Sequence, residues 1–125
     1  MMILDSNIII YAALPEHKLL RDLIKKEAPQ ISAITKVEVL GFHKLTSQAK
    51  GYFETFFEAA FAIPITSSII NRAVHLRQQK KMSLGDALIA ATALEHQLTL
   101  LTRNISDFEH IQDLTVIDPF DNQGL

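Results

Sequence analysis

Short apolar segments that alternate with longer helical segments constrain this fold more than any other feature of the chain. The apolar segments lack the in-out alternation of strands that face water on one side. Strands are expected at 3–4, 31–34, 61–65, 99–102 and 114–117. Helices are expected at about 6–14, 17–27, 35–40, 47–60, 67–81 and 83–97, with a helical turn at 106–110. This alternation predicts an α/β fold with a central, mostly parallel β-sheet of four to five strands, flanked by helices on both faces.

Length and composition are typical of one globular domain. The chain has 125 residues, of which 48% are hydrophobic and 21% are charged. We expect one domain over residues 1–120 and a loose C-terminal tail over residues 121–125. Twelve Lys and Arg against fourteen Asp and Glu give a net charge of −2, which excludes a strongly basic nucleic-acid-binding domain. The absence of Cys excludes disulfides, zinc-thiolate sites and Cys nucleophiles.

The N-terminal sequence indicates a protein that stays in the cytoplasm. MMILDSNIII has no basic segment and places Asp5 inside its apolar stretch, so it does not resemble a signal peptide. No apolar run approaches the roughly 20 residues needed to span a bilayer. We therefore expect no membrane contact.

Acidic residues follow the predicted strands, where ligands bind in open parallel sheets. Asp5 comes directly after the first strand, and Glu38 lies in the first turn after the second. Asp86 lies in the first turn of the helix that Ser83 begins. The strand at 99–102 is followed by polar residues, namely Thr102, Asn104 and Asp107. The sequence therefore predicts that carboxylates from separate elements meet at one edge of the sheet.

Helix capping is the alternative explanation for each acid taken alone. Thr35 and Glu38 have the spacing of a capping box, and Ser83 and Asp86 resemble one. Capping does not require the acids to converge, however, and neighbouring buried carboxylates are costly unless positive charge lies between them. In a chain without Cys, such oxygen ligands favour Mg²⁺, with Mn²⁺ as a substitute.

Four motifs resemble those of the PIN domain family, and most closely those of the short bacterial VapC-type toxins. They are DSNIIIY at Asp5, ITKVEVLGF around Glu38, GDALIAATAL around Asp86 and LLTRNISDF near the end. The resemblance covers nearly the whole chain. It implies a single PIN-like domain that acts as a metal-dependent endoribonuclease, the toxin of a toxin–antitoxin pair. It also implies a homodimer, silenced by a cognate antitoxin whose C-terminal segment packs across the active-site groove.

The resemblance assigns roles residue by residue. Asp5, Glu38 and Asp86 match the three acids of the family and are expected to be both catalytic residues and metal ligands, with Glu38 acting through water. The fourth acidic position of the family falls on Asn104, three residues before Asp107. Residues expected to orient the carboxylates or the substrate are Asn7, Thr102, Asn104 and Asp107.

Basic residues near the acids are expected to contact RNA phosphates, although an ordinary solvated helix face explains them equally well. Four of them are placed on the helix before Asp86, namely Arg72, Arg77, Lys80 and Lys81. Lys36 and Arg103 lie near the other acids.

Two other function classes compete with a nuclease. A receiver-like phospho-acceptor domain is also a small parallel α/β fold that binds Mg²⁺, but it needs adjacent acids after its first strand, where Asp5 stands alone. The other competing class is a binding module, namely a PIN fold that is catalytically weak or inactive. The presence of Asp5, Glu38 and Asp86 together argues against it.

Overall fold

Five short parallel strands lie at the centre of the protein, whose computed structural model describes residues 1–121. They are β1 (Met2–Leu4), β2 (Ile31–Ser32), β3 (Ala62–Ile63), β4 (Thr99–Leu101) and β5 (Val116–Ile117). The main sheet has the order β1-β4-β5, and β2 pairs with β3. A parallel bridge between Ile3 and Gln30 joins the two sheets, and the Leu4 N–H donates to the Gln30 carbonyl at 3.1 Å.

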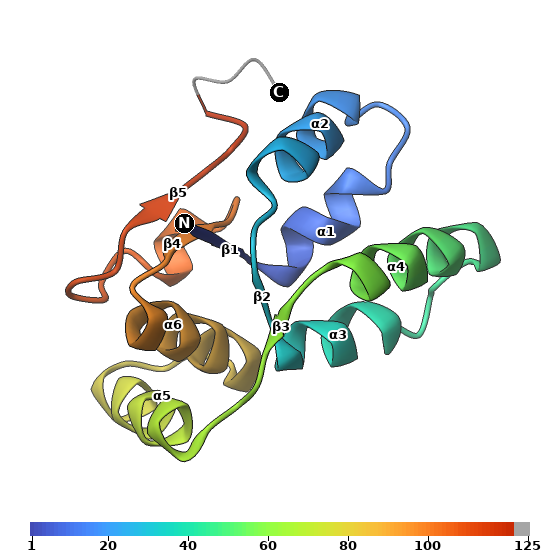
Figure 1. Cartoon of the computed structure of the whole chain (residues 1–125). Helices are drawn as coiled ribbons and strands as arrows, with labels where there is room; N and C mark the ends of the chain where they lie inside the picture. Colours follow the sequence, from blue (N-terminus) through green and yellow to red (C-terminus); the bar gives the residue numbers. More distant parts are fainter. Residues whose placement is uncertain (122–125) are drawn as a thin grey trace.

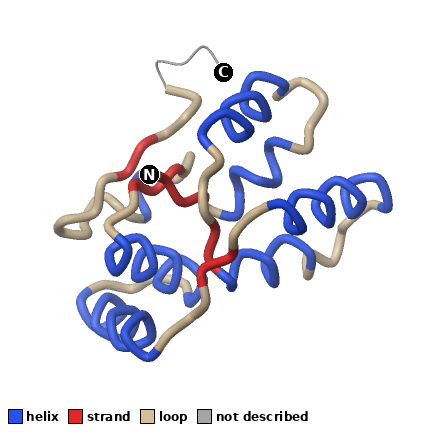
Figure 2. Tube along the Cα trace, viewed as in Figure 1, coloured by secondary structure: helices blue, strands red, loops and turns tan. Residues whose placement is uncertain are grey.

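Six helices and one short turn surround these strands. They are α1 (Ser6–Ala12), α2 (Lys18–Glu27), α3 (Ala33–Leu40), α4 (Ser47–Ala59), α5 (Ser67–Gln79), α6 (Leu84–His96) and the 3-10 turn η1 (Ile105–Asp107). Figure 1 shows α5 and α6 together on one side of the strands and α1 to α4 on the other. Figure 2 shows how short the strands are beside the helices. The predicted α/β fold is confirmed, with three strands in the main sheet and two more paired beside it.

The helices cover both faces because successive strand residues point in opposite directions. Ile3 and Leu100 belong to the core formed with α5 and α6, whereas Leu4 and Leu101 belong to the core formed with α1 to α4. All four side chains are almost completely buried. This explains why the strand sequences are apolar without alternation.

Helix α6 runs through the middle of the molecule and carries Asp86 near its beginning. Its buried residues include Ala87, Ala90, Ala91 and Ala93, all with no exposed surface. Small side chains let α3, α5 and the strands β2 and β4 approach α6 closely. Asp86 therefore lies at the start of a helix whose central turns are packed against other elements.

Several boundaries differ from the sequence prediction, and two of them concern predicted site residues. Helix α3 begins at Ala33 instead of Thr35, because the Ser32 hydroxyl caps it by accepting from the Ile34 N–H at 3.3 Å. Thr35 is consequently buried inside the helix and is not its cap. Helix α5 ends at Gln79, so Lys80 and Lys81 lie in the connection to α6 and not on the helix.

Two further expectations concern the ends and the surface. The expected loose tail lies almost entirely outside the described residues, which stop at Asp121. Within residues 1–121, none of the helices is long and apolar enough to cross a membrane.

Candidate functional site

Asp5 lies buried between the ends of β1 and β4, with both carboxylate oxygens hydrogen-bonded. Its backbone N–H donates to the Leu101 carbonyl at 2.9 Å, which fixes the residue against β4. Its Oδ1 accepts from the Ser6 N–H at 2.8 Å, and its Oδ2 accepts from the Thr102 hydroxyl at 2.7 Å. Thr102 is itself fully buried and accepts from the Asn104 N–H at 3.0 Å. Two strands and two following turns thus determine the orientation of this carboxylate.

Glu38 reaches the same region from α3. Its Oε1 accepts a hydrogen bond of 2.6 Å from the Ser6 hydroxyl. The rest of the carboxylate lies against the Cα of Gly85, in the first turn of α6. Ser6 therefore contacts two acids at once, Asp5 through its N–H and Glu38 through its hydroxyl.

Asp86 is placed by the N-terminal cap of α6. Its backbone N–H donates to the Ser83 hydroxyl at 3.1 Å, which confirms Ser83 as the cap. Burial is the largest of the causes that raise the pKa of Asp86 to about 6, and the negative charges of Asp5, Asp107 and Glu38 act in the same direction, against a hydrogen bond with Ser83 that lowers it. A carboxyl with this pKa is half protonated in mildly acidic solution.

The pKa of Asp5 is also raised. Burial is the largest cause, hydrogen bonds from Thr102 and Ser6 oppose it, and the charges of Glu38 and Asp107 add to it. Contacts bring the three predicted acids together, because Ser6 joins Asp5 to Glu38 and the Glu38 carboxylate lies against Gly85, the residue before Asp86. The charge of Asp107 acts on both Asp5 and Asp86.

The donor set of these four acids suits a hard cation that keeps its own water. Among residues 1–121, the ion pairs are Lys18–Asp22 and Arg72–Glu95, so none of the four acids forms an ion pair with Lys or Arg. In the same part of the chain, no three acidic or His side chains form a ready-made metal-binding group. Mg²⁺ fits such a site because it is typically held by one or two carboxylates and retains several waters.

The remaining polar candidates differ in their contribution. Asn7 is half-buried on α1 beside Ser6. Asn104 is exposed, and it contacts Thr102 through its backbone N–H, with no capping bond from its side chain to η1. Asp107 is exposed as well, but its charge acts on both Asp5 and Asp86. Of the two residues near the fourth acidic position, Asp107 thus supplies the negative charge.

A cleft of about 540 Å³ adjoins the acids and carries three of the predicted basic residues. Its lining includes Arg77, Lys80, Lys81, Asp86 and Asp107. Arg77 Nε donates to the Met82 carbonyl at 3.2 Å, across the connection between α5 and α6. The cleft therefore places positive side chains directly beside the carboxylates.

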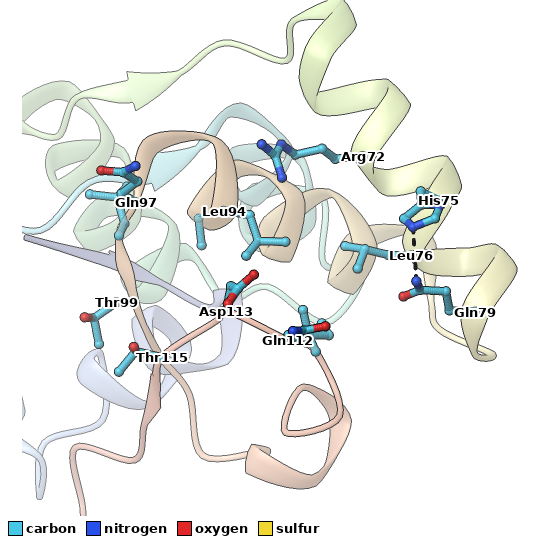
Figure 3. Close-up of a pocket in the computed structure, with 13 residues that line it drawn as sticks. Arg72, His75, Leu76, Gln79, Leu94, Gln97, Thr99, Gln112, Asp113 and Thr115 are labelled. Carbon is cyan, nitrogen blue, oxygen red and sulfur yellow. Dashed lines mark hydrogen bonds between the residues drawn. The ribbon is translucent and has the colours of Figure 1, made fainter.

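The other basic candidates are engaged elsewhere or stand apart. Arg72 pairs with Glu95 near the end of α6, roughly 15 Å along the helix from Asp86. There it lines a separate cavity of about 670 Å³, shown in Figure 3, whose lining contains none of the four acids.

Arg103 and Lys36 complete the basic candidates. The Arg103 guanidinium stacks 4.2 Å from the Phe120 ring centroid and 5.0 Å from that of Tyr11. Lys36 is exposed on α3.

Gly85 is the residue of the site that sequence reasoning missed. A glycine in the first turn of an otherwise alanine-rich helix, directly before Asp86, was the available signal for Gly85. Nothing in the sequence indicates that Ser6 contacts Glu38, because the two are 32 residues apart.

Comparisons with known proteins agree with the fold described above. The family model described as PIN domain matches residues 2–114. A chain of a toxin–antitoxin complex from Klebsiella pneumoniae is 32% identical, with a TM-score of 0.76 and coverage of 95% of this chain and 98% of that chain. A chain of FitAcB from Neisseria gonorrhoeae is 25% identical, with a TM-score of 0.77 and coverage of 97% and 99%.

A third solved structure is similar in fold alone. VapBC2 from Rickettsia felis, bound to a DNA fragment from their promoter, has a chain 23% identical at a TM-score of 0.80, with 93% of this chain and 96% of that chain covered. None of the curated proteins matches this chain significantly.

Proposed function

Because this chain belongs to the PIN domain family, we propose that it is a metal-dependent endoribonuclease and the toxin component of a toxin–antitoxin pair. The observation that carries the proposal is the meeting of Asp5, Glu38 and Asp86 at one edge of the sheet, where none of the three forms an ion pair with Lys or Arg. The similarity to chains of toxin–antitoxin complexes supports the assignment to toxins. The family match removes the receiver-like alternative.

Mg²⁺ is the proposed cofactor, with Mn²⁺ as a substitute. Asp5 and Asp86 would hold it directly or through water, and Glu38 would hold it through water. Such an ion, when bound, neutralises charge on a phosphodiester, activates a water for attack and assists the leaving oxygen.

The residues of the chain contribute by orienting carboxylates and moving one proton. Thr102 and the Ser6 N–H hold Asp5 with one hydrogen bond on each oxygen, so each oxygen keeps a free lone pair. Ser6 holds Glu38 through Oε1, which leaves Oε2 to accept the proton of the attacking water. The buried side of the site excludes bulk water around Asp5, which is 4% exposed.

RNA would approach through the cleft lined by Arg77, Lys80 and Lys81. Positive side chains there attract phosphates without reading sequence, so binding through them weakens as salt is added. Arg72 and Arg103 are less suited, because Arg72 pairs with Glu95 and Arg103 is stacked on Tyr11 and Phe120. Lys36 would contact the RNA on the side of the site formed by α3.

The proposed partners follow from the family. A cognate antitoxin would silence the enzyme in the cytoplasm by packing a C-terminal segment across the groove beside the acids. The enzyme would form a homodimer, and the exposed apolar side chains Ile70, Val74 and Leu84 offer a surface for it.

Cleavage of RNA by the purified chain tests the proposed function. We expect a mixed RNA pool to be cut in Mn²⁺ or Mg²⁺ and to stay intact in EDTA, and we expect expression of the chain alone to arrest bacterial growth. Asp5→Asn and Asp86→Asn should each lower the cleavage rate at least 100-fold, because each removes a ligand charge. Asp22→Asn is the matched control, since Asp22 is exposed and pairs only with Lys18.

RNA left uncut in Mn²⁺, together with normal growth, would refute the assignment as a nuclease. If that same protein still bound RNA, the inactive binding module would become the better assignment.

A further inference from the structure

Glu38 is held from two elements other than its own helix. A glutamate on an exposed helix face has three rotatable bonds and ordinarily samples several rotamers. Here Oε1 accepts 2.6 Å from the Ser6 hydroxyl on α1, while the carboxylate lies against Gly85 on α6. Helices α1 and α6 thus contact the same carboxylate from two sides.

Gly85 has no backbone reason to be glycine. It lies in the first turn of α6, outside the left-handed region of backbone conformation, and glycine disfavours a helix relative to alanine. A Cβ at this position would overlap Glu38 Oε2 and lie 2.9 Å from Glu38 Cδ. The three nearest atoms that it would meet outside its own helix backbone all belong to that carboxylate. The missing methyl group therefore makes room for one side chain, that of Glu38.

We propose that Ser6 and Gly85 are positioning residues that select one rotamer of Glu38 and so set its distance from Asp86 and Asp5. Ser6 attracts one oxygen of Glu38, and Gly85 leaves the space into which the other oxygen fits. The importance of this rotamer for catalysis rests on the proposed nuclease function. The positioning of Glu38 by Ser6 and Gly85 does not depend on that function.

Two substitutions displace Glu38 without touching the acids. Gly85→Ala fills the space, and the structure can relieve the overlap by rotating Glu38, which is the movable end of a flexible side chain. Ser6→Ala removes the hydroxyl but keeps the N–H that holds Asp5. Gly51→Ala is the matched control, because Gly51 is also helical, in α4, and a Cβ there meets nothing within 4 Å.

We expect Gly85→Ala to retain the thermal stability of the parent, as Gly51→Ala does. Its dissociation constant for Mn²⁺, measured by calorimetry, should rise about 10-fold, and kcat for RNA should fall about 10- to 100-fold with KM unchanged. Ser6→Ala should change both quantities in the same direction. In a Glu38→Gln background, Gly85→Ala should add little, because both substitutions act on the same side chain.

A crystal structure of Gly85→Ala separates this proposal from the nuclease function. A Glu38 carboxylate that has left the Ser6 hydroxyl supports the proposal, even if the parent cuts no RNA. An unmoved Glu38, or a Gly85→Ala protein that binds Mn²⁺ and cuts RNA as Gly51→Ala does, would overturn it. The proposal would also be overturned if Gly85→Ala reduced Mn²⁺ binding and RNA cleavage by the same factor in the parent and in the Glu38→Gln background.

Discussion

At the scale of single residues, the carboxylates of the site make the metal-free protein less stable as pH rises. The folded state holds a proton on Asp86 with a pKa of about 6, against 3.8 for an ordinary Asp, chiefly because the side chain is buried. The pKa of Asp5 is raised as well. A carboxyl whose pKa is higher in the folded protein than in the unfolded chain stabilises the folded state while it is protonated. This stabilisation is complete below the pKa of the unfolded chain and is lost as pH rises through the pKa of the folded protein.

Urea unfolding in EDTA at pH 4 to 8 measures this effect. We expect the free energy of unfolding to fall by about 1–2 kcal/mol between pH 4 and pH 7. This is less than the full pKa shift of a buried carboxyl would give, because Asp86 is partly exposed and solvent screens its charge. Asp86→Asn should remove most of the slope and leave the protein at least as stable at pH 7. Stability that rises with pH over this range, and falls in Asp86→Asn, would instead indicate that Asp86 serves only as a structural cap.

The individual acids were predictable from the sequence, but the contacts that hold them were not. Asp5 and Glu38 lie at one edge because each closely follows a parallel strand, and strand ends can be predicted from apolar runs. Asp86 follows helix α5 instead, and the Ser83 cap at the start of α6 was its local signal. The bond from Ser6 to Glu38 depends on how α1 packs beside α3, which no local pattern encodes. The same holds for Gly85, whose role depends on a side chain from another helix.

At the scale of elements, the cap of α6 links helix stability to the site. Ser83→Ala removes the hydroxyl that accepts from the Asp86 N–H, so we expect a loss of about 1 kcal/mol in the free energy of unfolding. The pKa of Asp86 should also rise, because the Ser83 hydrogen bond lowers it. NMR titration of the Asp86 carboxyl measures this second effect.

Thr66→Ala provides the comparison, since Thr66 caps α5 in the same way but without an acid beside it. It should lower stability by a similar amount while leaving the pKa of Asp86 unchanged. An identical pKa of Asp86 in both variants and the parent would show that Ser83 acts only on the helix.

Most element boundaries were predictable, and the exceptions have local causes. Strand β3 spans Ala62–Ile63 and is shorter than the expected 61–65, because Pro64 has no N–H to donate to a strand ladder. Strand β2 is also shorter than expected, because its last residue, Ser32, caps α3 and the chain continues into that helix. Hydrophobic periodicity alone does not reveal a buried serine that caps a helix.

At the scale of the whole molecule, the two-faced sheet explains why the fold was easier to predict than the site. Strands β1 and β4 each contribute one side chain to the core under α5 and α6 and the next to the core under α1 to α4, and these helices lie on opposite sides of the strands (Figure 1). That requirement makes most residues of these two strands apolar. The division into sheets of three and two strands was not predictable, because it depends on a single bridge at Gln30.

The arrangement of the whole molecule also decides where a cation can be held. Carboxylates from β1, α3 and α6 share one edge, and the basic cleft opens beside them. A crystal of the parent protein soaked in Mn²⁺ and measured at the manganese absorption edge locates the ion directly. The result that we predict is an anomalous peak between Asp5 and Asp86, lost in Asp86→Asn. A peak elsewhere, or none at a concentration at which the protein cuts RNA, would contradict the metal site.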